Sequence, residues 1–200
     1  EMSHVPVLLD SVLAALQPVD GDVIADLTFG AGGYSKAFLA SAECRVIGFD
    51  RDPDAIREGQ KLVAATSRFA LVEAAFSDFA DELEALDIHA VDGVVMDIGV
   101  LSMQLDQSER GFSFMRDGPL DMRMAQSGPS AADVVAQYSA EKLADIIYVF
   151  GEEQKSRAIG RAIVKARAEA PIETTKQLVA AIERATGPHR ERDADGCGHR

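Results

Sequence analysis

The sequence has few residues of several kinds, and each scarcity excludes a class of protein. Its 200 residues include only two cysteines, Cys44 and Cys197, which are far apart. A disulfide framework is therefore not expected, and a reducing, cytoplasmic location is the simpler expectation. The four histidines are scattered singly, so we expect no metal site.

Long apolar runs are also missing. No segment approaches the ~20 apolar residues that a membrane-spanning helix needs. Residues 1–4 do not resemble the basic start of a secretory signal, because no apolar stretch of the required kind follows a positive charge. We therefore expect no membrane partner.

Positive charge is scarce and unevenly distributed. The chain has 20 Lys and Arg against 33 Asp and Glu, a net charge of −13, which argues against bulk attraction to RNA. Residues 1–100 contain 6 basic and 18 acidic side chains, whereas residues 101–200 contain 14 and 15. Any contact with nucleic acid is therefore expected in the second half.

A glycine-rich turn between two short apolar runs is the main feature of the first half. The first run ends at Asp26 and the second at Asp50, and the turn between them contains three glycines: Gly30, Gly32 and Gly33. This pattern predicts a βαβ unit, in which glycine lets the backbone approach a ligand closely. Asp50, at the end of the second strand, can accept hydrogen bonds from two ribose hydroxyls, so the unit predicts a site for a nucleoside-containing cofactor.

The details of the turn favour S-adenosylmethionine (SAM) over NAD. A dinucleotide site usually has the pattern G-x-G-x-x-G/A, but Ser35 occupies the sixth position here. Asp26, before the turn, suits the ammonium group of an amino acid better than it suits a pyrophosphate. The alternative is a turn that only connects a strand to a helix.

The pattern of strands and helices continues to about residue 97. We predict further strands over 69–73 and 91–97, and helices over 53–65 and 81–86. Asp52 is expected to cap the helix that begins at Pro53, and Asp10 to cap an earlier one. The alternation predicts half of an α/β, doubly wound parallel sheet. Four residues are then expected at one edge of it: Asp26, Asp50, Phe76 and Asp97.

Phe76 is a candidate to pack on the face of an adenine, and the alternative is an ordinary core aromatic.

From Leu105 the periodicity disappears, and residues 107–124 combine arginines with phenylalanines and methionines. Basic residues among aromatics suit an unstacked base and its phosphates. The alternative is a loop folded onto its own domain, with its arginines paired to nearby aspartates.

Helices dominate after this loop. We expect them to start near Ser130, at Ser139 and at Thr174, with the strongest over residues 152–168. Arg157, Arg161 and Lys165 form a basic row on the strongest helix, which could bind phosphates or be a solvated face. Residues 187–200 are polar and glycine-rich, which predicts a disordered tail.

Residues 97–106 and 109–124 carry a family resemblance. With residues 4–10, 28–33, 50–53 and 148–153, they resemble the bacterial small-subunit ribosomal RNA (cytosine-N4) methyltransferases, the RsmH or MraW family. The resemblance covers residues 4 to about 186. It implies a Rossmann-like SAM-dependent methyltransferase sheet with a helical insertion, and SAM as cofactor. The implied substrate is the N4 of a cytidine in 16S ribosomal RNA or the small ribosomal subunit.

The resemblance also implies roles for particular parts of the chain. Residues 1–104 would form the SAM-binding domain and residues 105–186 a helical domain for RNA recognition. The implied cofactor contacts are Gly32, Gly33, Tyr34, Asp50, Phe76, Asp97 and Gln104, the last from the resemblance alone. Asp97 would accept hydrogen bonds from the amine or orient the cofactor, although it could simply cap a strand end. The expected RNA contacts are Arg110, Arg116 and Arg123.

Two departures from the family pattern leave alternatives open. Leu101 replaces the first of two serines, and the later segment with which the family completes its sheet does not occur. The chain could therefore be a catalytically incomplete fragment that binds SAM and RNA. It could also be a SAM methyltransferase for a protein or a small molecule. Unpaired sheet edges would favour a homodimer.

Overall fold

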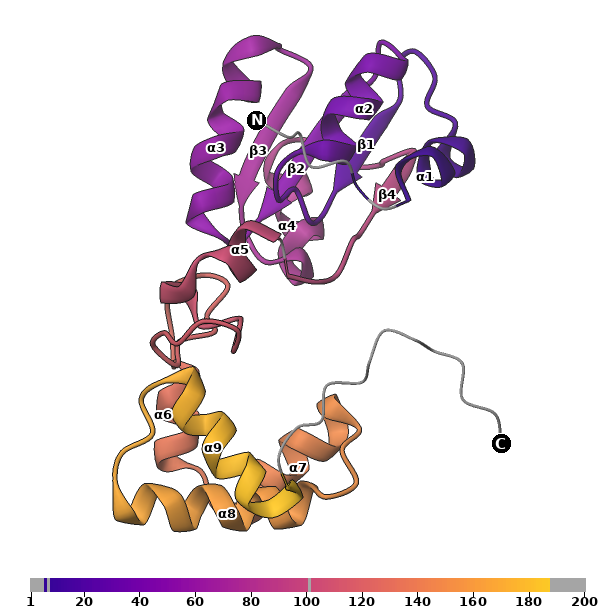
Figure 1. Cartoon of the computed structure of the whole chain (residues 1–200). Coiled ribbons are helices and arrows are strands. Elements are labelled where there is room, and N and C mark those ends of the chain that lie inside the picture. The colour runs from indigo at the N-terminus through magenta and orange to yellow at the C-terminus, as the bar shows by residue number, and fades with distance from the viewer. Residues whose placement is uncertain (1–5, 7, 101, 188–200) are drawn as a thin grey trace, which may run out of the picture. The chain divides into compact units, whose positions relative to one another are not determined.

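The computed structural model describes residues 6, 8–100 and 102–187. These residues form two compact units: one holds residues up to 100 together with Met124–Gln126, and the other holds residues 102–123 and 127–187 (Figure 1). Leu101, Cys197 and all of the expected tail except Gly187 lie outside the described residues. No helix in the described part of the chain is long and apolar enough to cross a membrane.

The first unit is built on a parallel sheet of four strands in the order β3-β2-β1-β4. The strands are β1 (Val23–Asp26), β2 (Arg45–Asp50), β3 (Phe69–Glu73) and β4 (Gly93–Val95). The α/β class and the parallel sheet predicted from the sequence are confirmed. The fourth strand is shorter than the 91–97 expected, because pairing with β1 spans only Gly93 to Val95.

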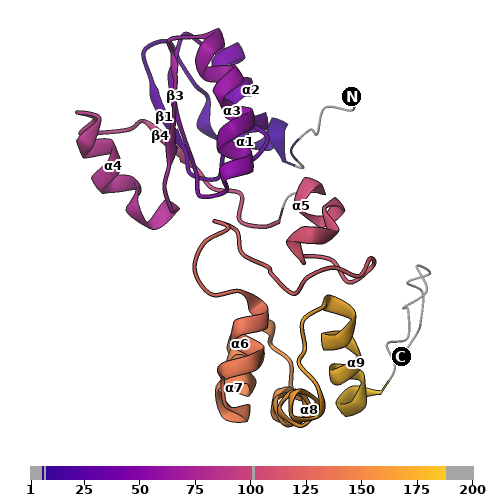
Figure 2. The same ribbon diagram turned by 90° about the vertical axis from the view of Figure 1, so that its left-hand side faces the viewer.

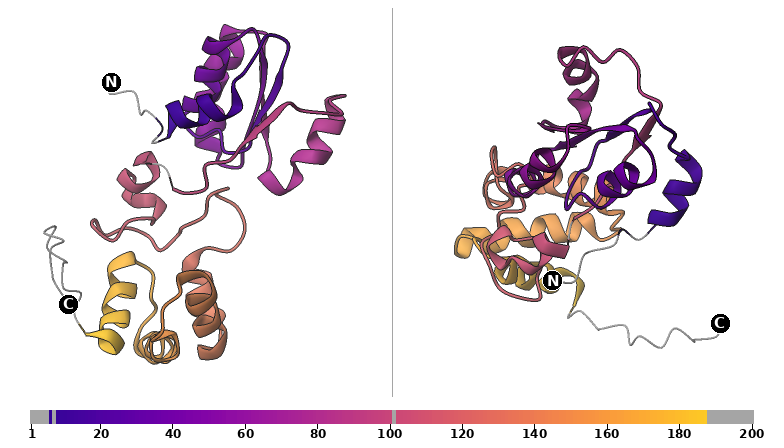
Figure 3. Two further views of the ribbon diagram at one scale, coloured as in Figure 1. Left: turned by 90° about the vertical axis from the view of Figure 1, so that its right-hand side faces the viewer. Right: turned by 90° about the horizontal axis from the view of Figure 1, so that it is seen from above.

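Helices cover both faces of this sheet, as the doubly wound pattern predicts. They are α1 (Leu9–Leu16), α2 (Gly33–Ser41), α3 (Pro53–Ala65), the 3-10 turn η1 (Phe76–Asp78) and α4 (Phe79–Ala85). Figures 2 and 3 show α4 on one side of the sheet and α1, α2 and α3 on the other. Alternate strand residues face the two sides: Ile24 and Val46 join one core, and Ala25 and Ile47 the other.

One of the two predicted helix caps in this unit is confirmed. Asp52 accepts a hydrogen bond from the Asp54 backbone N–H, with Pro53 in the first turn of α3. The predicted cap at Asp10 is wrong, because α1 already begins at Leu9 and Leu8 precedes it. Asp10 instead lies in the first turn, where its charge favours the helix dipole.

The second unit is helical. Its elements are α5 (Ser102–Asp106), the 3-10 turn η2 (Ser108–Arg110), α6 (Ala131–Gln137), α7 (Ala140–Gly151), α8 (Ser156–Glu169) and α9 (Thr175–Thr186). The helix starts predicted near Ser130, at Ser139 and at Thr174 are confirmed, and the side chains of these residues cap α6, α7 and α9. Helix α8 packs against α6, α7 and α9. Leu143, Ile159 and Ile163 are at the centre of this core.

The predicted start of the strongest helix is wrong by four residues. Helix α7 continues to Gly151, and Glu152 then adopts a left-handed conformation, with a φ of 53°, that ends it. The chain reverses before α8 begins at Ser156. The break depends on one left-handed residue that is not a glycine, so periodicity did not reveal it.

Candidate functional site

The carboxyl ends of the four strands lie at one edge of the sheet, because all the strands are parallel. The register places Asp26 beside Gly48 on one side and Val95 on the other, and Asp50 beside Glu73. Ligands in open parallel sheets bind outside such an edge. The residues that the sequence assigns to this edge are therefore brought together by the fold.

The glycine turn is held by the core beneath it. Phe29 is buried, donates its backbone N–H to the Phe49 carbonyl (2.9 Å), and lies 5.4 Å from the Phe69 ring. Gly32 has a φ of 75°, and a Cβ there would lie 2.7 Å from the Phe29 ring. Only glycine fits this position. Helix α2 therefore starts at Gly33 with no side-chain cap on its first N–H groups.

Asp26 is completely buried beneath this turn. It accepts a hydrogen bond from the Ser35 hydroxyl (2.7 Å) and others from the backbone N–H groups of Thr28 and Ser35. Burial raises the pKa of Asp26 to about 6, because it disfavours the charged carboxylate more than these hydrogen bonds stabilise it. With 0% of its surface exposed, Asp26 fixes the turn and has no free face for a ligand. The interpretation that it meets an ammonium group is therefore wrong in this conformation.

Ser35 was treated in the sequence only as a departure from the NAD pattern, and its structural role was missed. Its hydroxyl joins the first turn of α2 to the end of β1. A serine in the first turn of a helix, close after a buried acid, is the signal that could have revealed it.

Asp50 is oriented by two backbone groups. Its Oδ2 accepts from the Gly30 N–H (2.8 Å) and its Oδ1 from the Asp52 N–H (2.9 Å). The carboxylate is only partly buried. Each oxygen has a second lone pair, so the group can still accept two hydroxyl hydrogens from a ligand.

Asp97 lies exposed beyond β4, next to the turn. Its backbone N–H donates to the Thr28 hydroxyl (2.7 Å), which ties the fourth strand end to the first.

The Tyr34 side chain is buried and stacks on Phe38. Burial, and secondarily the charge of Asp97, raise the pKa of Tyr34. Tyr34 can therefore offer a ligand its backbone more readily than its ring.

Phe76 and Gln104 lie in different units. Phe76 belongs to η1, at the carboxyl end of β3, and is 43% exposed, so it is not the fully buried core aromatic of the alternative. Gln104 belongs to α5 in the second unit and is buried there. Its cofactor contact stays a prediction from the family resemblance.

The three predicted RNA arginines differ in their surroundings. Arg123 forms a two-pronged ion pair with Asp121 (2.9 and 2.6 Å) and donates to the Gly128 carbonyl, so the pKa of Asp121 is lowered. Arg110 is 7% exposed and donates to the Arg123 carbonyl (3.1 Å). Arg116 is exposed. The alternative of a self-folded loop thus applies to Arg123 and Arg110, and Arg116 is the one open to solvent.

The loop that holds these arginines is tightly folded. A Cβ at Gly118 would lie 1.9 Å from the Ser108 carbonyl oxygen, and one at Gly111 would lie 2.4 Å from that of Pro119.

Gln126, which the sequence did not single out, donates to Asp52 (3.2 Å) and Asp54 (3.1 Å) at the start of α3. Residues 124–126 therefore belong to the first unit.

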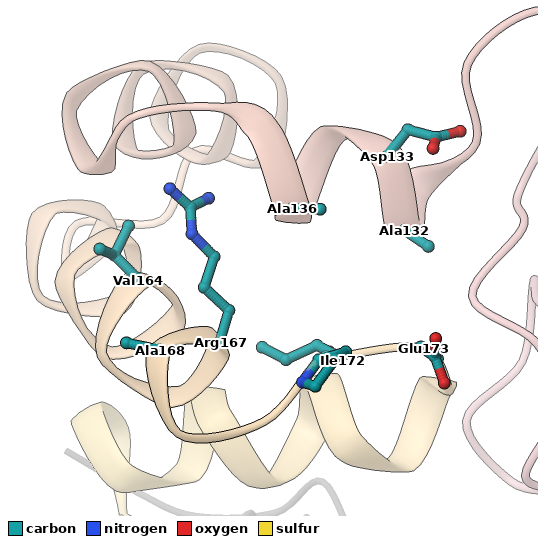
Figure 4. Close-up of a pocket in the computed structure, with 9 residues that line it drawn as sticks. Ala132, Asp133, Ala136, Val164, Arg167, Ala168, Ile172 and Glu173 are labelled. Atoms are coloured by element: carbon teal, nitrogen blue, oxygen red, sulfur yellow. The ribbon is translucent and has the colours of Figure 1, made fainter.

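A pocket of about 560 Å³ lies between α6, α8 and the segment before α9 (Figure 4). Arg167 reaches across it and donates to the carbonyls of Val135 (2.5 Å) and Tyr138 (2.6 Å) at the end of α6. Its guanidinium group is therefore used to join two helices. Among the described residues, no cluster of three or more His, Cys, Asp or Glu could hold a metal ion.

Comparison with known proteins gives strong sequence matches. The signature of the MraW methylase family matches residues 1–196. A ribosomal RNA small subunit methyltransferase H from Maricaulis maris is 55% identical over 185 residues, which is 92% of this chain and 55% of that protein. One from Nitrobacter winogradskyi is 60% identical over 176 residues, which is 88% of this chain and 53% of that protein.

The chain thus spans about half the length of these relatives. Among solved structures, an rRNA methylase from Streptococcus thermophilus aligns with a TM-score of 0.34 at 15% identity, covering 41% of this chain and 50% of that one. That likeness is too weak to support a functional argument.

Proposed function

Because the chain belongs to the MraW methylase family, we propose that it is part of a SAM-dependent methyltransferase that modifies small-subunit ribosomal RNA. Its named relatives are ribosomal RNA small subunit methyltransferases. The observation that supports the proposal best is the sheet edge, where the fixed glycine turn lies beside the oriented carboxylate of Asp50. We propose the cytoplasm as the location, where ribosomal subunits would be the substrate.

The proposed cofactor site uses the backbone at the start of α2 and the side chains around it. Gly32, Gly33 and Tyr34 would contact the amino-acid part of SAM through their main chain, and Asp50 would accept the ribose hydroxyls. Phe76 would pack on the adenine. Gln104 is retained as a proposed contact on the family resemblance alone.

The proposed reaction is transfer of the methyl group to the exocyclic N4 of a cytidine. That amine is a poor nucleophile, because its lone pair is delocalised into the ring. Holding it in line with the sulfonium carbon can provide much of the rate enhancement. The exposed carboxylate of Asp97, beside the turn, would accept a hydrogen bond from the amine and take a proton as the bond forms. The base must first leave its stack.

We propose residues 1–104 as the cofactor part and residues 105–186 as the part that recognises RNA. Arg116, which is exposed, would contact RNA directly. Arg110 and Arg123 would support the loop that presents it, through the hydrogen bonds they make within the loop. Self-association is also proposed, because Val94, Met96 and Ile98, on and just beyond the edge strand β4, are exposed.

One alternative has an observation in its favour. A chain that spans 55% of a relative could bind SAM and RNA without completing transfer. Both hypotheses place the cofactor at the same edge, and they differ only in turnover.

The test is methyl transfer from labelled SAM to unmodified small ribosomal subunits, with SAM binding measured by calorimetry. Label on a cytidine N4 supports the full proposal, and its loss in Asp97→Ala supports the role of Asp97. Saturable SAM binding without transfer favours the fragment. Label on protein and none on RNA would contradict the proposed substrate, and absence of SAM binding would contradict the site itself.

A further inference from the structure

A groove between α7 and α8 in the second unit has no role in the site described above. The two helices approach closely at Gly160, where a Cβ would lie 2.4 Å from the Ala140 carbonyl oxygen. Beside this contact a hollow of about 370 Å³ opens. Ala140 and Ala144 of α7 line it together with Arg157 and Arg161 of α8, so small residues face long basic ones across it.

The basic side of the groove is a row of three exposed cations on α8: Arg157, Arg161 and Lys165. They recur every four residues, so they share one face of the helix over about 12 Å. Within the described part of the chain, none of the three forms an ion pair. Arg184 of α9, by contrast, pairs with Glu169 (3.0 Å). The row is therefore free to neutralise charge on a ligand.

The turn end of the same groove has an exposed aromatic ring. Tyr148 follows Ala144 by four residues and so lies on the face of α7 that lines the hollow. It is 60% exposed. An open ring beside a row of cations matches the way proteins bind single-stranded RNA, by stacking bases and neutralising phosphates.

Two carboxylates also line the hollow, Glu141 and Asp145 of α7. They would repel phosphates on their side, so the phosphates of a bound strand would follow the α8 side. A carboxylate can accept hydrogen bonds from the exocyclic amines of bases. The α8 wall of the groove is thus basic and suits phosphates, whereas the α7 wall is acidic and suits the amines of bases.

We propose that this groove is a second RNA contact, in which Tyr148 stacks on an unpaired base and Arg157, Arg161 and Lys165 bind the phosphates of that strand. The inference rests on the proposed function, because it assigns the groove to the same RNA substrate. It adds a contact separate from the loop of Arg116.

The test measures the affinity of the chain for a fluorescein-labelled, single-stranded RNA of about 12 nucleotides by anisotropy at several salt concentrations. The variant R157A/R161A/K165A removes the row. A matched control, R57A/K61A/R184A, removes three cations that are each paired with an acid. Three lost phosphate contacts should lower the salt slope by about 2 and weaken binding about 100-fold at 0.1 M salt. The control should change little.

A second pair of variants separates stacking from charge. Tyr148→Ala should weaken binding by about fivefold or more, whereas Tyr148→Phe keeps the ring and should bind like the wild type. All these positions are exposed, and circular dichroism melting would check that each variant is folded. Tyr148→Ala that binds as the wild type does would overturn the stacking role.

Equal affinity and salt slope in the two triple variants would overturn the proposal, as would a wild type that does not bind this RNA. Binding of polyglutamate as tightly as RNA would also overturn it, because the groove would then prefer any acidic chain. The proposed function is distinguished by its own readouts. Methyl transfer can fail while the groove variants still lose RNA affinity, and loss of RNA affinity should leave SAM binding unchanged.

Discussion

Asp26 and Asp50 end adjacent strands, but their carboxylates have opposite surroundings. Asp26 is fully buried and used within the fold, whereas Asp50 is partly exposed and fixed by two backbone N–H groups. The sequence shows each as an acid after an apolar run. Their different roles give two predictions at the scale of single residues.

Asp50→Ala should weaken SAM binding by roughly tenfold or more, because two hydrogen bonds to a charged acceptor are lost. Calorimetric titration with SAM would measure this. Asp81→Ala, which removes an exposed acid from α4, is the matched control and should bind SAM as the wild type does. Unchanged affinity in a folded Asp50→Ala variant would mean that the nucleoside binds elsewhere.

Asp26 predicts a pH dependence of stability. Its pKa is raised from 3.8 to about 6 in the folded state, so between these values the folded chain holds a proton that the unfolded chain has lost. Its contribution to the free energy of unfolding is therefore fully present below pH 3.8 and is lost as the pH rises through 6. The loss should amount to about 2–3 kcal/mol.

Denaturant unfolding of the wild type and Asp26→Asn at pH 4 and pH 7 would measure this. The free energy of unfolding of the variant, relative to that of the wild type, should be higher at pH 7 than at pH 4 by that amount. A difference that stays constant with pH would show that Asp26 is charged throughout.

At the scale of elements, one side chain joins two helices of the second unit. Arg167 of α8 donates to two carbonyls at the end of α6. The last carbonyls of a helix have no N–H donor within the helix, so they need a partner from outside it. Lys165, two residues earlier on α8, is exposed. The two cations therefore make a matched pair on one helix, one structural and one open.

Arg167→Ala should lower the free energy of unfolding by roughly 2 kcal/mol, because hydrogen bonds to a charged donor are lost at a partly buried site. Lys165→Ala should change it by less than about 0.5 kcal/mol. Chemical denaturation followed by circular dichroism would compare them. Equal effects would mean that Arg167 contributes no more than a surface charge.

At the scale of the whole molecule, charge separates the two halves of the chain. Residues 1–100 have 6 basic and 18 acidic side chains, and residues 101–200 have 14 and 15. Phosphates are repelled by the first half, so RNA should approach the second.

Ultraviolet cross-linking to small-subunit ribosomal RNA, followed by mass spectrometry, would test this. Cross-linked peptides should come mainly from residues 105–186. Cross-links concentrated in residues 8–90 would contradict the assignment of RNA recognition to the second unit, whatever the outcome for the cofactor site.

Local patterns in the sequence were enough to predict the sheet, the glycine turn, most helix starts and the sheet edge at which Asp50 and Asp97 lie. These features depend on local patterns: apolar runs, glycines that take positive φ, and capping residues next to the helices they cap. Parallel strands then place their carboxyl ends together without further information. The family followed from long local motifs for the same reason.

Packing between distant segments decided which groups are used inside the fold. The Asp97 backbone N–H donates to the Thr28 hydroxyl, 69 residues earlier in the chain, and the Gln126 side chain donates to Asp52, 74 residues earlier. The burial of Asp26, the pairing of Arg123 and the break before α8 depend likewise on packing between segments. Burial and hydrogen-bond geometry are properties of neighbours in space, and no local pattern of residues specifies them.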